Sequence, residues 1–271
     1  MAFRHNYALV AAGSVGKTLI GRLPARSRQI GPVAAVSYRV ASRIANSLRA
    51  GRAVRALADL DRNQIILFHA PPDQIRPLLH LCFASPLNWQ GRTIVFCDCT
   101  PPSGALAQLR AVGASTATAR TFGVPGFAIV QGGPHALLIA RRIVRDAGLR
   151  PLEIASDGTD MFSAAVTLAT AALTPLIDRA AYLLRCAGLR DGDSIKVTEI
   201  LFEQTVRGYG RSGRQSWLWH IGAPSPEQLE AELCALDSNL ASLFQRLLLL
   251  GFETFDKHPD IASSLRRSHN C

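Results

Sequence analysis

The stretch "YALVAAGSVGKTLI", residues 7–20, supports two interpretations of one glycine turn. Ala11–Gly16 has the pattern A-x-G-x-x-G, which is close to the turn that binds dinucleotides. Ala11–Thr18 also has the pattern A-x-x-x-x-G-K-T, a relaxed form of the phosphate loop of ATPases. Both patterns place the turn between a strand and a helix, where the helix N-terminus binds phosphate. The stretch therefore predicts a nucleotide-phosphate site and leaves the nucleotide open.

The residues that follow extend this turn into an α/β domain. Short apolar runs alternate with helical patterns, and "QIILFHA" at 64–70 is continuously apolar, as in a strand covered on both faces of a parallel sheet. This succession predicts a doubly wound Rossmann-like domain over residues 1–155. Residues 156–271 carry helical patterns without strand patterns. We therefore expect an all-helical second domain there.

Local chemistry predicts several helix boundaries. A helix over 14–27 follows the glycine turn, and Gly51 closes the next helix. In the second half, Pro175 is expected to kink or divide a long apolar helix. Asp193 or Ser194 is expected to cap one later helix, and Ser225, followed by proline, to cap another.

Composition limits the classes of function. The 271-residue chain has a net charge of +10, and nearly all its basic residues are arginines spread along the sequence. A nucleic-acid binder would more often cluster them on one element, so we expect small anionic ligands and no nucleic acid. We see neither an apolar run of about 18 residues nor a secretory signal, which favours a cytoplasmic protein without a membrane span. The six cysteines lack zinc-site spacing, so we expect buried thiols and no metal.

The residues after the second strand favour the dinucleotide interpretation. In a Rossmann domain an acid at this place binds the ribose 2′-hydroxyl, whereas an arginine accommodates a 2′-phosphate. Here "VAAV" is followed by Ser37, Tyr38 and Arg39, with Arg43 one helical turn further on and no acid. The expected cofactor is therefore NADP.

The phosphate-loop interpretation has its own support. Such a loop needs a lysine, a hydroxyl and an acidic residue at the end of a buried strand to hold magnesium. Lys17, Thr18 and Asp98 supply these groups. No switch loop, arginine finger or base-recognition motif accompanies them.

A family resemblance covers nearly the whole chain. The order "VAAGSVGKTL", "VSYRVASRIANSL", "ADLDRNQIILFHAPPDQI" and "GRTIVFCDCTPPSGALAQLRAVGAS", followed by a helical half, resembles the 6-phosphogluconate dehydrogenase-like superfamily. Ketopantoate reductase and pyrroline-5-carboxylate reductase belong to it, and "SWLWHIGAPSPEQLEAEL" is similar to its Trp/Thr-Gly-Pro segment. The resemblance implies that NADP lies across the glycine turn and the ends of the second and fourth strands, at Gly13, Ser14, Val15, Gly16, Ser37, Tyr38, Arg39, Ala70 and Pro71.

The polar groups that the resemblance implies for proton transfer are replaced in this chain. Phe96-Cys97-Asp98-Cys99 stands where the family carries a histidine, and "ATARTFGVPG" stands where it carries a His-Pro pair. Phe162-Ser163-Ala164-Ala165 replaces Tyr-His-Ala-Ala, and Ala171 replaces an asparagine. Asp98 and Ser163 are the candidate catalytic residues that remain, together with Thr100, Thr167, Thr170 and His69. Each also has a structural interpretation, as a cap, a helix hydroxyl bonded to its own backbone or a core histidine.

Three hypotheses follow. The first is an NADP-dependent oxidoreductase that transfers hydride to or from a small carbonyl, imine or hydroxy compound bound between the domains. The second is a nucleotide-binding sensor or scaffold that has lost hydride transfer. The third is a phosphate-loop ATPase. In each case the apolar helical half is expected to form a homodimer.

Overall fold

The computed structural model describes residues 7–23, 29–216 and 225–255. Contacts divide the chain into two units, Met1–Ala165 and Val166–Cys271. The predicted boundary after residue 155 precedes helix α7 (Thr159–Ala169), whereas the boundary between the units falls within that helix.

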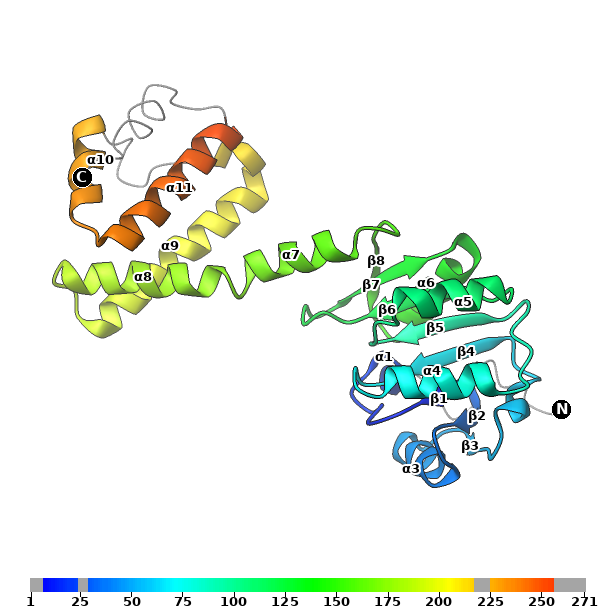
Figure 1. The fold of residues 1–271 in the computed structure, drawn as a ribbon. Helices are drawn as coiled ribbons and strands as arrows, with labels where there is room; N and C mark the ends of the chain where they lie inside the picture. Colours follow the sequence, from blue (N-terminus) through cyan, green and yellow to red (C-terminus); the bar gives the residue numbers. More distant parts are fainter. Residues whose placement is uncertain (1–6, 24–28, 217–224, 256–271) are drawn as a thin grey trace. The chain divides into compact units, whose positions relative to one another are not determined.

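Within the described residues, eight strands of the first unit form one sheet in the order β3-β2-β1-β4-β5-β6-β7-β8 (Figure 1). All neighbouring pairs are parallel except β6 and β7. The order β3-β2-β1-β4-β5-β6 is that of a doubly wound Rossmann sheet, so the predicted fold class is confirmed. The strands are β1 (Tyr7–Ala11), β2 (Ile30–Ala34), β3 (Arg52–Ala53), β4 (Ile65–His69), β5 (Thr93–Cys97), β6 (Ser115–Arg120), β7 (Phe127–Gly132) and β8 (Arg150–Glu153).

Helices cover both faces of this sheet. On one face, α1 (Leu19–Arg22), α3 (Tyr38–Leu48) and α6 (Pro134–Asp146) pack on alternate strand residues. On the other, the 3-10 turn η1 (Leu57–Leu60), α4 (Ile75–Ala84) and α5 (Ser103–Ala111) do the same. This double cover explains why β1 and β5 are buried at every position.

Helix α1 is shorter than predicted. The expected helix over 14–27 is reduced to the four residues Leu19–Arg22, and residues 24–28 lie outside the described part of the chain. The helix ends at Leu23, whose backbone is extended with φ −60° and ψ 126°. Leu23 precedes a proline in the sequence, and a proline disfavours helical backbone at the residue before it.

Strand β6 was not predicted. Its sequence "STATAR" has no apolar run, because alanine and threonine alternate along it. Ala117 and Ala119 are nevertheless buried in the core beneath α6. The small side chains allow a close approach of α6, and sequence patterning alone does not reveal such a strand.

The second unit is helical, as predicted, and its core contains Leu229 and Phe252. The expected long helix is divided into α7 and α8 (Leu173–Cys186) by a turn at 170–172. Pro175 lies in the first turn of α8, and a proline ring clashes with the carbonyl four residues earlier, so the division agrees with its predicted effect. The remaining elements are α9 (Asp191–Ser212), the 3-10 turn η2 (Gly213–Ser216), α10 (Pro226–Cys234) and α11 (Ser238–Phe255).

The two predicted caps had different outcomes. Ser225 caps α10 as expected, because its hydroxyl accepts from the amide of Gln228 while the Gln228 side chain accepts from the amide of Ser225. The cap predicted for α9 was wrong. That helix begins one residue after Arg190, and Ser194 donates its hydroxyl to the carbonyl of Asp191 inside the first turn.

The glycine that permits close packing is Gly21 rather than Gly16. A Cβ at Gly21 would lie 2.1 Å from the carbonyl oxygen of Gly16, whereas a Cβ at Gly16 would meet no atom within 4 Å. We expect Gly21→Ala to lower the free energy of unfolding by about 1–3 kcal/mol through overpacking. Gly16→Ala is the matched control and should change it by less than about 0.5 kcal/mol. Urea unfolding without ligand measures both, and equal losses would contradict this assignment.

Candidate functional site

The glycine turn lies where β1 and β4 end side by side. The amide of Ala12 donates to the carbonyl of His69 at 2.8 Å, which joins the two strand ends. Gly13 has a left-handed backbone with φ 71°, and a Cβ there would lie 3.1 Å from Cδ of Pro71. Only glycine adopts this conformation without strain. The structure therefore brings the predicted residues Gly13 and Pro71 together, with Ala70 buried beside them.

The backbone amides of this turn have no acceptors among the described residues. Ala12 and Thr18 donate within the fold, to His69 and Val15 respectively. Between them, the five amides of residues 13–17 make no recorded hydrogen bond, although the turn leads directly into α1. Gly13, Ser14, Gly16 and Lys17 are exposed and only Val15 is buried, so most of this turn is open to a ligand. A row of amides at a strand-to-helix turn is suited to bind phosphate oxygens.

Asp98 holds this turn in place. One carboxylate oxygen accepts from the amide of Leu19 at 2.6 Å, at the start of α1. The other accepts from the amide and the hydroxyl of Thr121, at 2.6 and 2.8 Å, just beyond β6. Asp98 itself has a left-handed φ of 50°, a strained backbone for a residue with a side chain. These bonds make Asp98 a positioning residue, and its catalytic function remains a prediction.

The geometry does not favour the phosphate-loop interpretation. A magnesium site needs free carboxylate and hydroxyl groups near the lysine. The Asp98 carboxylate already binds three donors, and the buried Thr18 hydroxyl donates to the carbonyl of Val15 at 2.7 Å. Among the described residues, no group of three or more His, Cys, Asp or Glu side chains is arranged to hold a metal ion.

His69 and three cysteines belong to the core beneath the site. Nδ1 of His69 lies 2.8 Å from the carbonyl oxygen of Cys97, so the histidine is bonded within the sheet. Burial raises the pKa of the Cys82 and Cys99 thiols to about 12, and it raises the pKa of Cys97 well above its usual value. These thiols stay protonated at neutral pH and are unsuited to act as nucleophiles. Cys186 and Cys234, which were also expected to be buried, are exposed.

The end of β2 presents an aromatic and arginine surface. The Ser37 hydroxyl accepts from the amide of Val40 and caps α3, which leaves Tyr38 and Arg39 exposed at the first turn. The guanidinium carbon of Arg55 lies 5.2 Å from the ring centre of Tyr38, a cation–π distance. Arg55 follows β3 and was not among the predicted residues, because nothing in the sequence brings it near Tyr38. The sheet order places it there.

Ser163 lies on α7, whose residues Thr159 and Phe162 contact β7 and the segment beyond β6. Thr159, at the start of α7, donates to the side chain of Gln131 at 2.8 Å, and Gln131 follows the buried part of β7. The ring of Phe162 packs edge-on against Phe122, with 5.1 Å between the ring centres. Phe122 is the second residue beyond β6, next to the threonine that binds Asp98. The two predicted catalytic residues are thus connected through Thr121, Phe122 and Phe162, and Ser163 itself is exposed.

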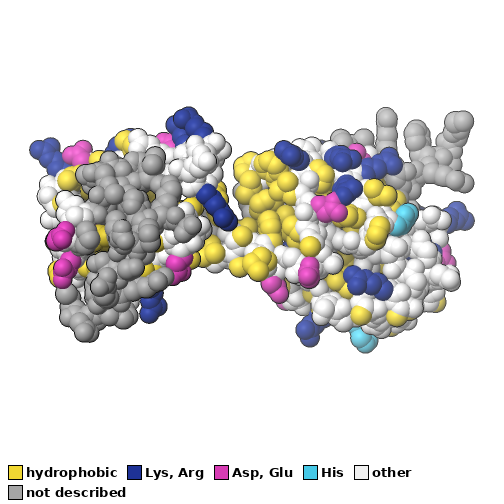
Figure 2. Space-filling view, turned by 90° about the horizontal axis from the view of Figure 1, so that it is seen from above, with side chains coloured by type: hydrophobic (Ala, Val, Ile, Leu, Met, Phe, Trp, Pro, Cys, Tyr) yellow, Lys and Arg dark blue, Asp and Glu magenta, His cyan; other side chains and the backbone are white. Residues whose placement is uncertain are grey.

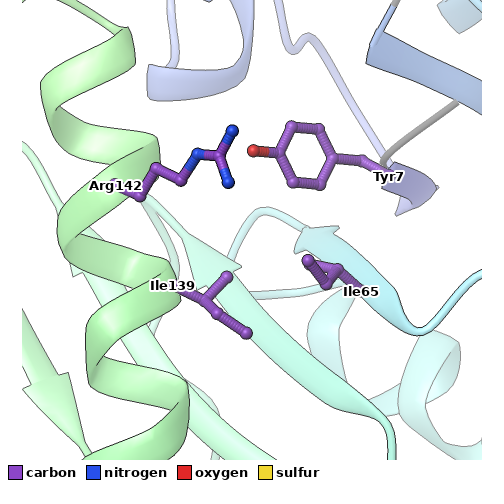
Figure 3. Close-up of a pocket in the computed structure, with 4 residues that line it drawn as sticks. All are labelled: Tyr7, Ile65, Ile139 and Arg142. Carbon is purple, nitrogen blue, oxygen red and sulfur yellow. The ribbon is translucent and has the colours of Figure 1, made fainter.

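A cavity of about 170 Å³ lies at the opposite, amino-terminal edge of the sheet. It is lined by Tyr7, Ile65, Ile139 and Arg142, and Figure 3 shows the Tyr7 hydroxyl and the Arg142 guanidinium pointing toward one another. Tyr7 and Ile65 begin their strands, so this cavity is separate from the glycine turn at the other end of β1. Ligands of open α/β sheets bind at the carboxyl edge, so we do not assign the nucleotide to this cavity.

Surface composition adds two observations. Figure 2 shows Lys and Arg side chains spread over the visible face rather than gathered into one stripe. One helical stretch of the described chain, Thr159–Cys186, is long and apolar enough to cross a membrane, with a mean hydropathy of 1.4 and no buried share. A long apolar helix was expected here, but a stretch that passes the criteria for a membrane span was not. A single stretch of this kind is weak evidence for a membrane span.

Comparisons with known proteins concern the fold. No protein-family model and no curated protein matches this sequence. A candidate NADP oxidoreductase from Bacteroides fragilis superposes with a TM-score of 0.68 at 14% identity, covering 92% of this chain and 98% of that one. An imine reductase from Aspergillus terreus gives 0.62 at 12% identity, and one from Myxococcus stipitatus gives 0.60 at 18%. Each of these two alignments covers 98% of this chain and 94% of the other.

Part of the "SWLWHIGAPSPEQLEAEL" segment of the family resemblance, residues 217–224, lies outside the described residues. The catalytic and cofactor residues remain predictions, because none of these comparisons tests a single side chain. The chain has the fold shared by these solved oxidoreductases, an N-terminal Rossmann-like domain followed by helices.

Asp98→Asn tests the positioning function of Asp98. The amide nitrogen of asparagine cannot accept from Leu19 or Thr121, so one of the two attachments must be lost. We expect a fall of about 2 kcal/mol in the free energy of unfolding, as for other hydrogen bonds to charged groups. Asp73→Asn, at an exposed turn residue, is the control. If both variants unfold at the same urea concentration as the unmodified protein, the Asp98 bonds do not stabilise the turn.

Proposed function

We propose that this chain binds NADP(H) on its first unit and transfers hydride to or from a small carbonyl, imine or hydroxy compound. The observation that carries the proposal is the row of five amides at residues 13–17, at the carboxyl end of β1, which have no acceptors in the part of the chain that the structure describes. A pyrophosphate supplies acceptors for such a row, and a Rossmann sheet of this order holds its dinucleotide at this edge.

The residues present fit this cofactor at three places. The amides of 13–17 bind the pyrophosphate, and Gly13 lets the backbone come close to it. Arg39 and Arg55 bind the 2′-phosphate, together with Ser37 and Tyr38. Ala70 and Pro71 line the path toward the ends of β4 and β5. The bound cofactor supplies the hydride, and the protein orients it.

The solved relatives support the chemistry by analogy. Imine reductases from Myxococcus stipitatus have been solved with NAD+ and with NADP+, and one from Aspergillus terreus with NADPH4. These proteins share 12–18% identity with this chain, so their substrates are not transferred to it. The substrate would lie near Asp98 and Ser163, which both belong to the first unit.

A second candidate function is nucleotide binding without turnover. It is supported by the polar groups near the proposed reaction centre, which already have hydrogen-bond partners within the chain. The Asp98 carboxylate is bonded to three donors, and Thr100 accepts from Arg120 at 2.8 Å. Steady oxidation of NADPH with any small carbonyl or imine would exclude this alternative.

Arg39→Ala and Arg55→Ala test the cofactor assignment. Each removes one charge-assisted contact to the 2′-phosphate, so we expect the Kd for NADPH to rise by about tenfold or more. NADH lacks that phosphate, and its weaker binding should be unchanged. Arg76→Ala, on the exposed side of α4, is the matched control. Thermal shift with NADPH, NADH and Mg-ATP measures all three ligands, since a ligand bound to the native state raises Tm.

Two results would overturn the cofactor assignment. If NADPH does not raise the Tm of the unmodified protein, the nucleotide site is wrong. If Mg-ATP alone raises it, the glycine turn is a phosphate loop after all.

We propose further that the helical unit forms a homodimer in the cytoplasm. Several apolar side chains of this unit are exposed, among them Leu168 at 68%, Val206 at 64% and Ile195 at 60%. Ile195, Phe202, Val206 and Tyr209 follow one side of α9 at helical spacing, which suits packing against a second helix. The buried thiols of Cys82, Cys97 and Cys99 are compatible with a reducing compartment.

Sedimentation tests the dimer, with an expected mass of twice 29.2 kDa. Val206→Lys places a charge on the exposed side of α9 and should shift the mass toward the monomer. Leu81→Lys, at an exposed position on α4 of the first unit, should not. A monomeric mass for the unmodified protein, or binding to lipid vesicles in its place, would contradict the proposal.

A further inference from the structure

Arg120 lies at the carboxyl edge of the sheet, beside the residues that hold the glycine turn. It ends β6, and its neighbour Ala119 pairs with Cys97 of β5. Ala119 accepts from the amide of Asp98, while Thr121 donates to the Asp98 carboxylate. Arg120 is therefore fixed between two attachments to Asp98, on the edge where Rossmann domains bind their ligands.

The guanidinium of Arg120 has few acceptors. Nη1 donates to the hydroxyl of Thr100 at 2.8 Å, and the buried Nε has no hydrogen-bond partner. Among the described residues, no carboxylate forms a salt bridge with it, and the nearby Asp98 carboxylate is bonded to backbone and hydroxyl donors. An arginine side chain is charged throughout the working pH range, so this cation lacks a counter-ion.

Arg92 shows how this chain satisfies an arginine with a structural function. Its guanidinium donates to the carbonyls of Asn88, Leu60, Asn63 and Asp61 and pairs with the Asp61 carboxylate at 2.8 Å. Every guanidinium nitrogen of Arg92 has an acceptor. Arg120, at the other edge of the same sheet, has one neutral acceptor among the described residues. The contrast indicates that this guanidinium is left open to a further acceptor.

The neighbouring groups are apolar. Phe122, two residues further on, packs edge-on against Phe162, and both rings are partly exposed. Cys99, which precedes Thr100, is buried in the apolar core. Arg binds a carboxylate through two parallel hydrogen bonds, and Phe122 follows Arg120 by two residues, so this part of the edge suits an anionic group attached to an apolar skeleton.

We propose that Arg120 binds the carboxylate of the substrate, so that the reaction acts on a small organic acid with an apolar part against Phe122 and Phe162. This inference rests on the proposed NADP function, because it names the substrate class of the same site. Thr100 holds the guanidinium in position until the acid binds. Arg120 is a binding residue and takes no part in the hydride step.

The test uses a matched pair of probes, 3-phenylpropanoate and 3-phenylpropanamide, titrated calorimetrically into the full chain saturated with NADP+. The two probes differ only in the charge of the group that faces Arg120. We expect the acid to bind at least tenfold more tightly than the amide. Arg120→Gln should weaken binding of the acid by ten- to a hundredfold and leave the amide unchanged. Arg110→Gln, at an exposed position on α5, is the control.

The remaining outcomes either contradict the inference or show whether the cofactor assignment fails independently of it. Equal binding of the two probes, or full binding of the acid to Arg120→Gln, overturns it while the NADP site stands. A loss of NADPH affinity in Arg120→Gln also overturns it, because Arg120 then holds the cofactor. If NADPH does not bind at all, the proposed function fails. The acid is then titrated into the free protein, where only binding that depends on Arg120 supports the anion site.

A second variant keeps the inference testable if the first variant has a folding defect. If Arg120→Gln does not fold, Arg120→Lys keeps the charge and removes the paired donors. We expect this variant to weaken binding of the acid by about tenfold, since lysine presents a point charge without the planar pair of donors. Unchanged affinity for the acid in this variant would contradict binding through a paired contact.

Discussion

The first unit depends on one carboxylate. Asp98 accepts hydrogen bonds from Leu19 and Thr121, and so ties the end of β5 to the start of α1 on one side and to the end of β6 on the other. It does so from a left-handed backbone conformation that side chains rarely adopt. Strain of this kind persists where the surroundings compensate for it, and here the compensation comes from charge-assisted bonds to both neighbours.

This arrangement explains how a four-residue helix can present a phosphate site. Helix α1 is too short to be stable by itself, because a helical turn is costly to nucleate. Its first amide is held by Asp98, and its Gly21 lies against the carbonyl of Gly16. The turn between β1 and α1 is therefore fixed from outside, and its five amides are left to face a ligand. Positioning of the turn, rather than acid–base chemistry, is the function that the geometry supports for Asp98.

Much of the fold could be predicted from the sequence because its elements carry strong local patterns. The runs at β1, β4 and β5 are continuously apolar, and Pro175 and Ser225 act through chemistry confined to a few residues. Strand β6 could not be predicted, because alanine and threonine give no apolar run. The helix predicted at α1 was too long, because the real helix ends before Leu23, the residue that precedes a proline. The surroundings of Arg55 and Arg120 depend on residues 17 and 20 positions away, Tyr38 and Thr100. Only the sheet order reveals such contacts.

The central claim is that the amides of residues 13–17 bind a dinucleotide phosphate, and hydrogen–deuterium exchange tests it most directly. Deuterium uptake is measured by mass spectrometry on peptides that cover 12–19, with and without saturating NADPH. Amides that bind phosphate exchange slowly, so the account predicts that NADPH slows exchange in these peptides, while the α10 peptides stay unchanged. If NADPH binds and exchange across residues 13–17 is unaltered, the turn is not the phosphate site and the account is wrong.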